Sequence, residues 1–291
     1  MNSRPLRLPK ATDVTDTASF PTATRRVSGS LPQISYLDVP AADGAGDAPP
    51  LLLLHGVGSS SETWQRLTPL LDGRRVIAPD YRGHGASEAP DPPYDIADFT
   101  ADALRLLDEL GVEQVHVLGF SIGALFAEQL ALVAPERVLS LVLLNSIADR
   151  TPEQRARAEA RREVIASTPP SETSKASAAR WFTPGFIAQQ PALVQSEVDI
   201  VAAVAHAPYA ASYAVLVEND PIDVVEAITC PTLIITGEFD EGSTPAMSEA
   251  LHRRIRRSRL VVVPDVKHYI HIELPEIVAA EVNGFLATAD R

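Results

Sequence analysis

Cysteine is nearly absent from this chain of 291 residues, in which Cys230 stands alone. One cysteine excludes an internal disulfide framework and a cysteine-based metal cluster. This usage is consistent with a reducing compartment, and we predict a cytoplasmic protein. The sequence also lacks an apolar run of the roughly 20 residues that a transmembrane helix needs, so we expect no membrane span.

Positive charge is scarce as well. The chain has 25 Lys and Arg against 38 Asp and Glu, which gives a net charge of −13 at pH 7. Such a surface repels nucleic acid and anionic membranes, so we expect neither as a partner. Hydrophobic residues make up 45%, as in ordinary soluble globular proteins. We therefore expect a small-molecule ligand or substrate, and a homo-oligomer is compatible with the composition.

The first 30 residues differ from the rest of the chain. They are rich in Thr, Ser, Ala and Pro and lack the apolar core of a secretory signal. We predict a flexible N-terminal tail over residues 1–30, with a targeting peptide as the alternative.

From residue 31 onward, short apolar runs alternate with segments of helical periodicity. Several runs are continuously apolar, which is typical of parallel strands buried on both faces. The alternation predicts an α/β fold with a mostly parallel twisted sheet and helices on both faces. We expect strands at 34–39, 51–55, 75–79, 115–119, 139–144, 232–237 and 260–264, and helices at 62–71, 96–110, 122–134, 244–255 and 275–287.

One long stretch, residues 147–228, contains no convincing strand. It is rich in Ala, Arg and Glu and interspersed with aromatic residues. We predict that it forms a helical cap inserted into a core made of residues 31–146 and 229–291.

The motif Gly119-Phe120-Ser121-Ile122-Gly123 follows an apolar strand and opens an apolar helix. A nucleophile on so tight a turn needs small neighbours, because the backbone is strained and larger side chains would clash. The N-terminus of the helix also favours negative charge that develops nearby. We therefore predict that Ser121 is a catalytic nucleophile. The alternative is a structural glycine turn with a capping serine.

A second motif, His55-Gly56-Val57-Gly58, directly follows four leucines. A turn there can aim the Val57 amide into the mouth of the sheet. Together with the Ile122 amide it would form a two-donor oxyanion hole. We expect His55 itself to be a buried structural residue.

A serine nucleophile requires a base and an acid that orients it. His268 follows the strand LVVVP late in the chain and is our candidate base, with His271 as its competitor. Asp240 follows the strand TLIITG and is our candidate acid, with Glu238 and Glu241 as rivals.

These motifs and their order, Ser…Asp…His, resemble the α/β-hydrolase fold family over about residues 31–289. The resemblance implies an α/β-hydrolase fold, and it implies that Asp80, Arg82 and His84 are structural. A serine at position 121 separates the chain from haloalkane dehalogenases and soluble epoxide hydrolases, which use aspartate there. The matching pieces are HGVG at 55–58, PDYRGHGAS at 79–87, GFSIG at 119–123, TGEFD at 236–240 and VKHYIHIELPE at 266–276.

Two further segments, ARWFTPGF at 179–186 and TCPTLIITGEFDEGSTPAM at 229–247, are similar to those of 3-oxoadipate enol-lactonases. This likeness implies hydrolysis of a small acidic enol-lactone or related ester in the catabolism of aromatic compounds. An inward arginine of the cap would then bind the substrate carboxylate, and we expect Arg180 to do so. Trp181, Tyr209 and Tyr213 are candidates for the pocket wall; the alternative is ordinary packing of the cap onto the core.

The expected reaction is acyl transfer to water through an acyl-enzyme, with no metal and no cofactor. Two other reactions share the same catalytic residues: hydrolysis of a C–C bond in a ring-fission product, and hydrolysis of a small acidic amide. A ligand-binding receptor with a vestigial triad is the alternative outside enzymes. The presence of Ser121, Asp240 and His268 together argues against it.

Overall fold

A computed structural model describes residues 23–42 and 48–290 of the chain. Its centre is an eight-stranded sheet with the order β1-β2-β4-β3-β5-β6-β7-β8. The first two pairings, β1 with β2 and β2 with β4, are antiparallel, and all the others are parallel. The strands are β1 Thr24–Val27, β2 Ser35–Val39, β3 Leu51–Leu54, β4 Val76–Pro79, β5 Val115–Phe120, β6 Val138–Leu144, β7 Thr232–Gly237 and β8 Ser258–Val263.

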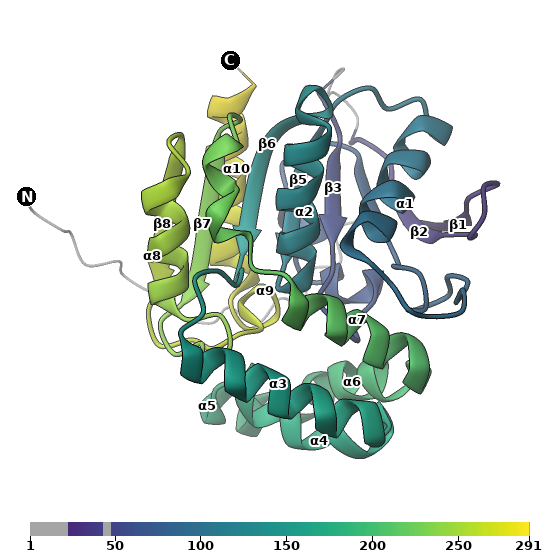
Figure 1. The fold of residues 1–291 in the computed structure, drawn as a ribbon. Helices are drawn as coiled ribbons and strands as arrows, with labels where there is room; N and C mark the ends of the chain where they lie inside the picture. Colours follow the sequence, from purple (N-terminus) through teal and green to yellow (C-terminus); the bar gives the residue numbers. More distant parts are fainter. Residues whose placement is uncertain (1–22, 43–47, 291) are drawn as a thin grey trace, which may run out of the picture.

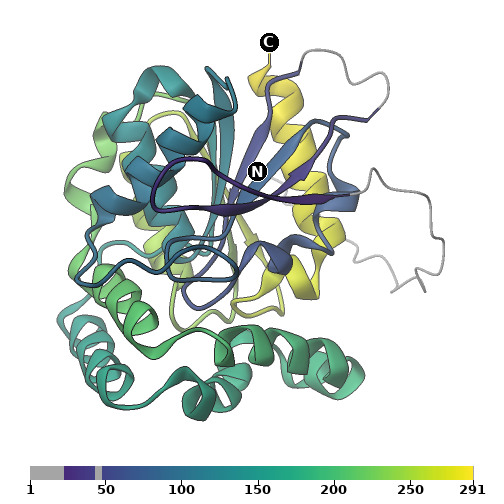
Figure 2. The same ribbon diagram turned by 90° about the vertical axis from the view of Figure 1, so that its right-hand side faces the viewer.

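Helices cover both faces of this sheet, with α10 on the face opposite to α1 and α2 (Figures 1 and 2). The arrangement confirms the predicted α/β-hydrolase fold. The helices of the core are α1 Ile96–Glu109, α2 Ile122–Val133, α8 Pro245–Arg254, α9 Ile270–Glu273 and α10 Pro275–Ala289.

The four consecutive leucines of β3 show why the central strands are continuously apolar. Leu51 and Leu53 pack in the cluster that contains α10, whereas Leu52 and Leu54 pack in the cluster that contains α1 and α2. Successive side chains of a strand point to opposite faces, so a strand covered on both faces needs an apolar residue at every position.

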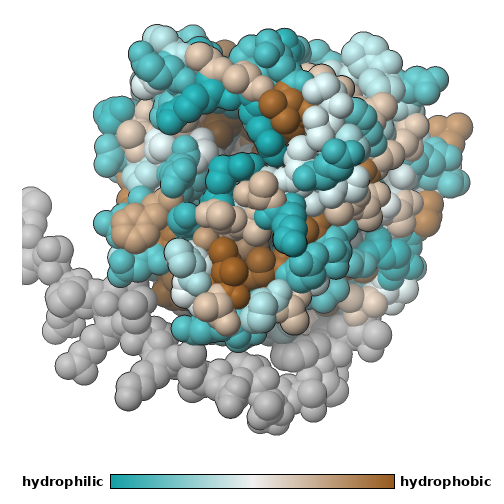
Figure 3. Space-filling view, turned by 90° about the horizontal axis from the view of Figure 1, so that it is seen from below, coloured by the Kyte–Doolittle hydropathy of each residue, from teal (hydrophilic) through white to brown (hydrophobic). Residues whose placement is uncertain are grey.

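Five α-helices lie between β6 and β7, at the carboxyl ends of the parallel strands (Figure 1). We call them the helical insertion, and they occupy the place where we predicted the cap. The surface on this side is mainly hydrophilic, with apolar side chains gathered in small areas (Figure 3). The helices of the insertion are α3 Pro152–Ser167, α4 Pro170–Trp181, α5 Pro184–Gln189, α6 Pro191–Ala202 and α7 His206–Glu218.

Among the described residues, one bent pair of these helices passes a length-and-composition test for a membrane span. No single helix of the described ranges is long and apolar enough to cross a membrane. By length and composition alone, α6 and α7 pass the test together, with a bend of 97° between them.

Two expectations need correction. The predicted helix over 62–71 is replaced by two 3₁₀ turns, Ser61–Trp64 and Thr68–Leu70. Pro69 has no N–H to continue an α-helical ladder at that point. We predicted a flexible tail over 1–30, but residues 24–27 of it form β1, which pairs with β2. Arg25 of this strand also forms a 2.7 Å ion pair with the buried Asp80. Residues 1–22 of that prediction lie outside the described residues.

Candidate active site

Ser121 lies at the turn between β5 and α2, with φ 57° and ψ −119°. This left-handed φ is unfavourable for a residue with a side chain, so the surroundings must impose it. The two flanking glycines allow the close packing that does so. A Cβ on Gly119 would collide with the carbonyl oxygen of Gly123, and one on Gly123 would collide with that of Leu54. The serine is therefore held in a strained turn against the end of β3.

Asp240 and His268 come together from the loops that follow β7 and β8. Asp240 Oδ2 lies 2.6 Å from His268 Nδ1, and Asp240 Oδ1 accepts the amides of Gly242 and Ser243 at 2.9 and 3.0 Å. Burial disfavours the charge of this carboxyl. The nearby His268 and these donors outweigh burial and hold the pKa of Asp240 below its usual value. The pair leaves Nε2 of His268 as the nitrogen that can exchange a proton with another group.

Asn145 belongs to the same network, although our reading of the sequence did not single it out. It directly follows β6, is fully buried, and has φ 51°. Its side-chain amide donates to Asp240 Oδ2 at 2.7 Å, so that oxygen has two donors. The available signal was a polar residue immediately after the apolar run VLSLVLL, at the edge where neighbouring parallel strands end.

The rival candidates lie in different environments. Glu238 accepts the amide of Asp265 at 3.1 Å in an exposed setting, and Glu241 is exposed. His271 is fully buried with Nε2 2.9 Å from the Thr63 hydroxyl. Burial, reinforced by the nearby His268, lowers the pKa of His271 to about 3. A histidine held neutral in this way is poorly suited to accept a proton near pH 7.

The loop that contains Val57 lies directly against the Ser121 turn. A Cβ on Gly56 would come within 2.9 Å of the Phe120 ring, and the Cβ of Ser121 lies 3.6 Å from the same point. In the described part of the chain, neither the Val57 amide nor the Ile122 amide donates a hydrogen bond. Both amides thus have no acceptor within the described residues and belong to segments that meet at Ser121, and the oxyanion hole stays a prediction.

Two buried histidines brace this loop. His55 accepts the Tyr81 amide at Nε2 (3.1 Å), and His84 accepts the Gly58 amide at Nε2 (3.1 Å). Burial lowers the pKa of His55 to about 3 and that of His84 to about 4, so both rings are neutral. Both histidines are bonded to backbone groups of neighbouring loops, in agreement with a structural role.

The other polar residues of the PDYRGHGAS segment are also engaged in fixed contacts. Asp80 accepts the amides of Ser61 and Ala86 at 2.7 and 3.0 Å. Arg82 forms a two-pronged pair with the buried Asp102 at 2.7 and 2.9 Å. These contacts tie the segment to the 61–64 turn and to α1.

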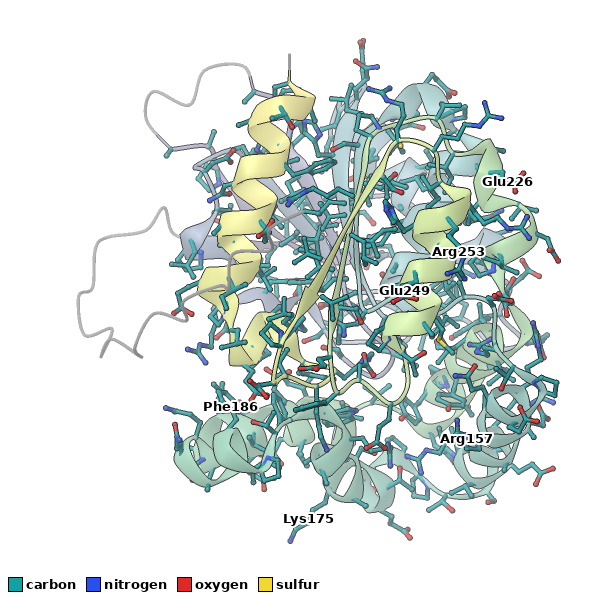
Figure 4. All side chains as sticks on the ribbon, turned by 90° about the vertical axis from the view of Figure 1, so that its left-hand side faces the viewer. Arg157, Lys175, Phe186, Glu226, Glu249 and Arg253 are labelled. Carbon is teal, nitrogen blue, oxygen red and sulfur yellow. The ribbon has the colours of Figure 1, made fainter. Side chains whose placement is uncertain are left out.

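Arg180 is exposed to solvent, but its guanidinium reaches back along α4 to a buried hydroxyl. Its guanidinium donates to the Oγ of the buried Ser177 at 2.7 Å, and Arg161 of α3 donates to the same oxygen at 3.3 Å. Burial, with the nearby Arg161, lowers the pKa of Arg180, while Tyr213, Tyr209 and Glu241 oppose this effect. Neither Arg161 nor Arg180 forms an ion pair within the described residues. By contrast, Lys175 of the same helix extends away from the sheet (Figure 4).

The predicted pocket residues cluster with the Val57 loop. Tyr209 is buried, with Val57, Trp181 and Tyr213 packed against the same small cluster. A Cβ on Gly58 would come within 2.6 Å of the Tyr209 ring. The insertion therefore places aromatic rings, and next to them the guanidinium groups of Arg161 and Arg180, over the loop beside Ser121. Arg161 was missed by our sequence analysis, since nothing distinguishes it from the exposed arginines of α3.

Comparison with known proteins gives consistent matches over most of the chain. The model of the alpha/beta hydrolase fold matches residues 49–275. The chain is 34% identical to 3-oxoadipate enol-lactonase 2 of Acinetobacter baylyi over 239 residues, which cover 81% of this chain and 88% of the relative. It is 35% identical to the putative carbamate hydrolase RutD of Variovorax paradoxus over 252 residues, 84% of this chain and 94% of the relative. The solved enol-lactonase from Burkholderia xenovorans LB400 matches with a TM-score of 0.80 at 28% identity, covering 88% of this chain and 96% of that chain.

A buried carboxyl beneath the insertion makes the stability of the protein depend on pH. Glu197 of α6 is 4% exposed and lies 3.3 Å from the Thr63 hydroxyl. Burial raises the pKa of Glu197 from 4.5 to about 7, although the Thr63 hydrogen bond opposes the rise. The unfolded chain releases this proton at lower pH than the folded one. Stability is therefore lost as the pH rises from about 4.5 to 7.

We predict that Glu197→Gln removes this loss. In urea denaturation at pH 8, the free energy of unfolding of the variant should exceed that of the wild type by up to about 3 kcal/mol. At pH 5 the two free energies should be nearly equal. Glu172→Gln, which neutralises an exposed carboxylate of α4, serves as the control and should show no such difference. A stability gain for Glu197→Gln that is equal at both pH values would contradict the assignment.

Proposed function

The chain belongs to the alpha/beta hydrolase fold family, and from that premise we propose that it is a serine hydrolase of small carboxylic esters or enol-lactones. The observation that carries the proposal is the Asp240–His268 pair, whose imidazole lies with its centroid 4.9 Å from the ring of Phe120, the residue directly before the strained Ser121. An imidazole oriented by a buried carboxylate, next to a serine on a tight strand-to-helix turn, is the arrangement that nucleophilic acyl transfer needs.

The proposed reaction has two steps. In the first, Ser121 Oγ attacks the acyl carbon while His268 Nε2 takes its proton, and the developing oxyanion accepts the Val57 and Ile122 amides. The bond to the leaving oxygen then breaks, and that oxygen receives the proton from His268. In the second step, His268 takes a proton from water, which attacks the acyl-enzyme. Ser121 regains its proton as the carboxylic acid leaves.

Asp240 holds the imidazole through these steps. Its bond to Nδ1 fixes the tautomer with Nε2 free, and its charge stabilises the imidazolium that forms twice in each cycle. Asn145 and the amides of Gly242 and Ser243 keep the carboxylate in place.

We infer further that the substrate is acidic. Arg180 and Arg161 share the Ser177 hydroxyl, and a carboxylate that bridges them would relieve the repulsion between two like charges. The likeness to enol-lactonases supports the same substrate class, an acidic intermediate of aromatic-compound catabolism.

A second candidate is hydrolysis of a small acidic amide or carbamate. The 35% identity to a putative carbamate hydrolase favours it, and the proposed catalytic residues would be the same. An acyl transfer to water differs between these substrates only in the leaving group, which is nitrogen instead of oxygen.

One prediction of the proposed function concerns the nucleophile. Ser121→Ala should lower kcat for 3-oxoadipate enol-lactone by at least about 10⁴-fold, because the acyl-enzyme cannot form. Turnover is measured by loss of the lactone absorbance, and circular dichroism checks that the variant is folded. Near-normal turnover by a folded variant would refute the nucleophile. If the wild type turns over only acidic amides or ring-fission diketones, Ser121 remains the proposed nucleophile and the lactone is excluded as the substrate.

Another prediction of the proposed function concerns the acidic group of the substrate. Arg180→Ala should raise KM for the acidic lactone by about tenfold, because a charge-assisted hydrogen bond to its carboxylate is lost. KM for a neutral short-chain activated ester should change much less. Lys175→Ala removes a positive charge from the outer side of the same helix and is the matched control. Equal effects of Arg180→Ala on both substrates would rule out the carboxylate role.

A further inference from the structure

The corner between α4 and α5, residues 179–183, is bound to the loop that carries His268. The Tyr269 amide donates to the Trp181 carbonyl at 2.9 Å. Lys267 Nζ donates to the Ala179 carbonyl at 2.6 Å, near the C-terminal end of α4, where a positive charge is favourable. Two residues that flank His268 in sequence thus hold two carbonyls of the corner.

A third attachment lies further along the same loop. Glu273 accepts both the amide and the hydroxyl of Thr183, with the amide at 3.1 Å. Thr183 also begins α5, because its Oγ1 accepts the Phe186 amide at 3.3 Å. Glu273 is therefore the only side chain in this set that binds the start of α5 to the histidine loop through two hydrogen bonds.

Aromatic rings fill the space between these attachments. Trp181 stacks on Tyr269 with ring centroids 5.0 Å apart and an angle of 27°. Phe182 is fully buried and lies 5.1 Å from the same Tyr269 ring. The corner and the histidine loop are therefore packed as one body, in contrast to an insertion that merely rests on the core.

Arg180 lies inside this fixed corner, between Ala179 and Trp181. Its backbone is therefore bound on both sides to the loop of His268, while its guanidinium extends to Ser177. A shift of the corner would move the guanidinium and the imidazole relative to each other.

We infer that Glu273 and Thr183 are positioning residues that set the selectivity for acidic substrates, by holding Arg180 in register with His268. This inference rests on the proposed function. A carboxylate on Arg180 places the scissile carbonyl at Ser121 only if the two ends of the site keep their separation. A neutral substrate does not use Arg180 and is less sensitive to that separation.

Charge alone predicts the opposite result for one variant. Glu273→Gln removes a negative charge from the side of the site where the acidic substrate binds, which would improve binding of an anion. Glutamine keeps only one acceptor oxygen, so one of the two Thr183 donors loses its partner and faces an NH2 group, which loosens the corner. The direction of the effect therefore separates positioning from charge.

The experiment compares kcat/KM at pH 8 for the mono-4-nitrophenyl ester of adipic acid and for 4-nitrophenyl hexanoate, with Ser121→Ala as the blank. For Glu273→Gln we expect the acid-to-neutral ratio to fall by roughly three- to tenfold, mainly through KM of the acidic ester. Thr183→Val, which changes no charge, should lower the ratio in the same way. Thr183→Ser keeps the hydroxyl and should therefore keep the acid-to-neutral ratio of the wild type. Glu276→Gln, which removes an exposed carboxylate three residues away, should leave the ratio unchanged.

The possible outcomes distinguish failure of the positioning role from failure of the proposed function. A ratio that rises or stays constant in Glu273→Gln and Thr183→Val overturns the positioning role, provided that Arg180→Ala lowers the ratio. A ratio unaffected by Arg180→Ala refutes the carboxylate site and this inference with it. Activity that persists in Ser121→Ala refutes the proposed function itself. Thr183→Val keeps the test decisive if Glu273→Gln does not fold, as judged by circular dichroism.

Discussion

The close approach of backbone around Ser121 is the constraint on which the site depends. Gly119 and Gly123 have no side chains, so the turn after β5 can press against the carbonyl of Leu54 at the end of β3. That contact fixes the strained φ of Ser121 and brings the Val57 loop beside it. The Ser121 amide in turn donates to the Leu144 carbonyl at 3.0 Å, directly before Asn145. The serine, the free amides and the support of Asp240 are therefore consequences of one packing arrangement at the carboxyl ends of β3, β5 and β6.

Burial divides the histidines near the site into two kinds. His55, His84 and His271 are enclosed without a carboxylate in hydrogen-bonding contact, and burial lowers the pKa of each well below the ordinary value. They accept or share hydrogen bonds as neutral rings and hold loops together. His268 differs because it is bonded to Asp240, whose charge is kept by four donors. The same residue type thus acts as a brace or as the proposed base according to the partner that the fold provides.

Much of this arrangement was predictable from the sequence, because it depends on local patterns. The apolar runs located seven of the eight strands, and GFSIG located the turn at Ser121. β1 was missed because TRRV is exposed and polar, and its order comes from pairing with β2 and from the ion pair of Arg25 with Asp80. Asn145, Arg161 and Glu273 were missed for a similar reason. Their partners are 95, 16 and 90 residues away in sequence, and no local pattern encodes such contacts.

The central claim is that Ser121 is a nucleophile activated by His268 and oriented through Asp240. The most direct measurement is the rate and position of covalent labelling by a fluorophosphonate, which reacts with activated serines, followed by peptide mass spectrometry. We expect one adduct, on Ser121, that forms far more slowly in His268→Ala and Asp240→Asn while both variants remain folded. An adduct on another residue, or labelling of Ser121 at an unchanged rate in both variants, would contradict it.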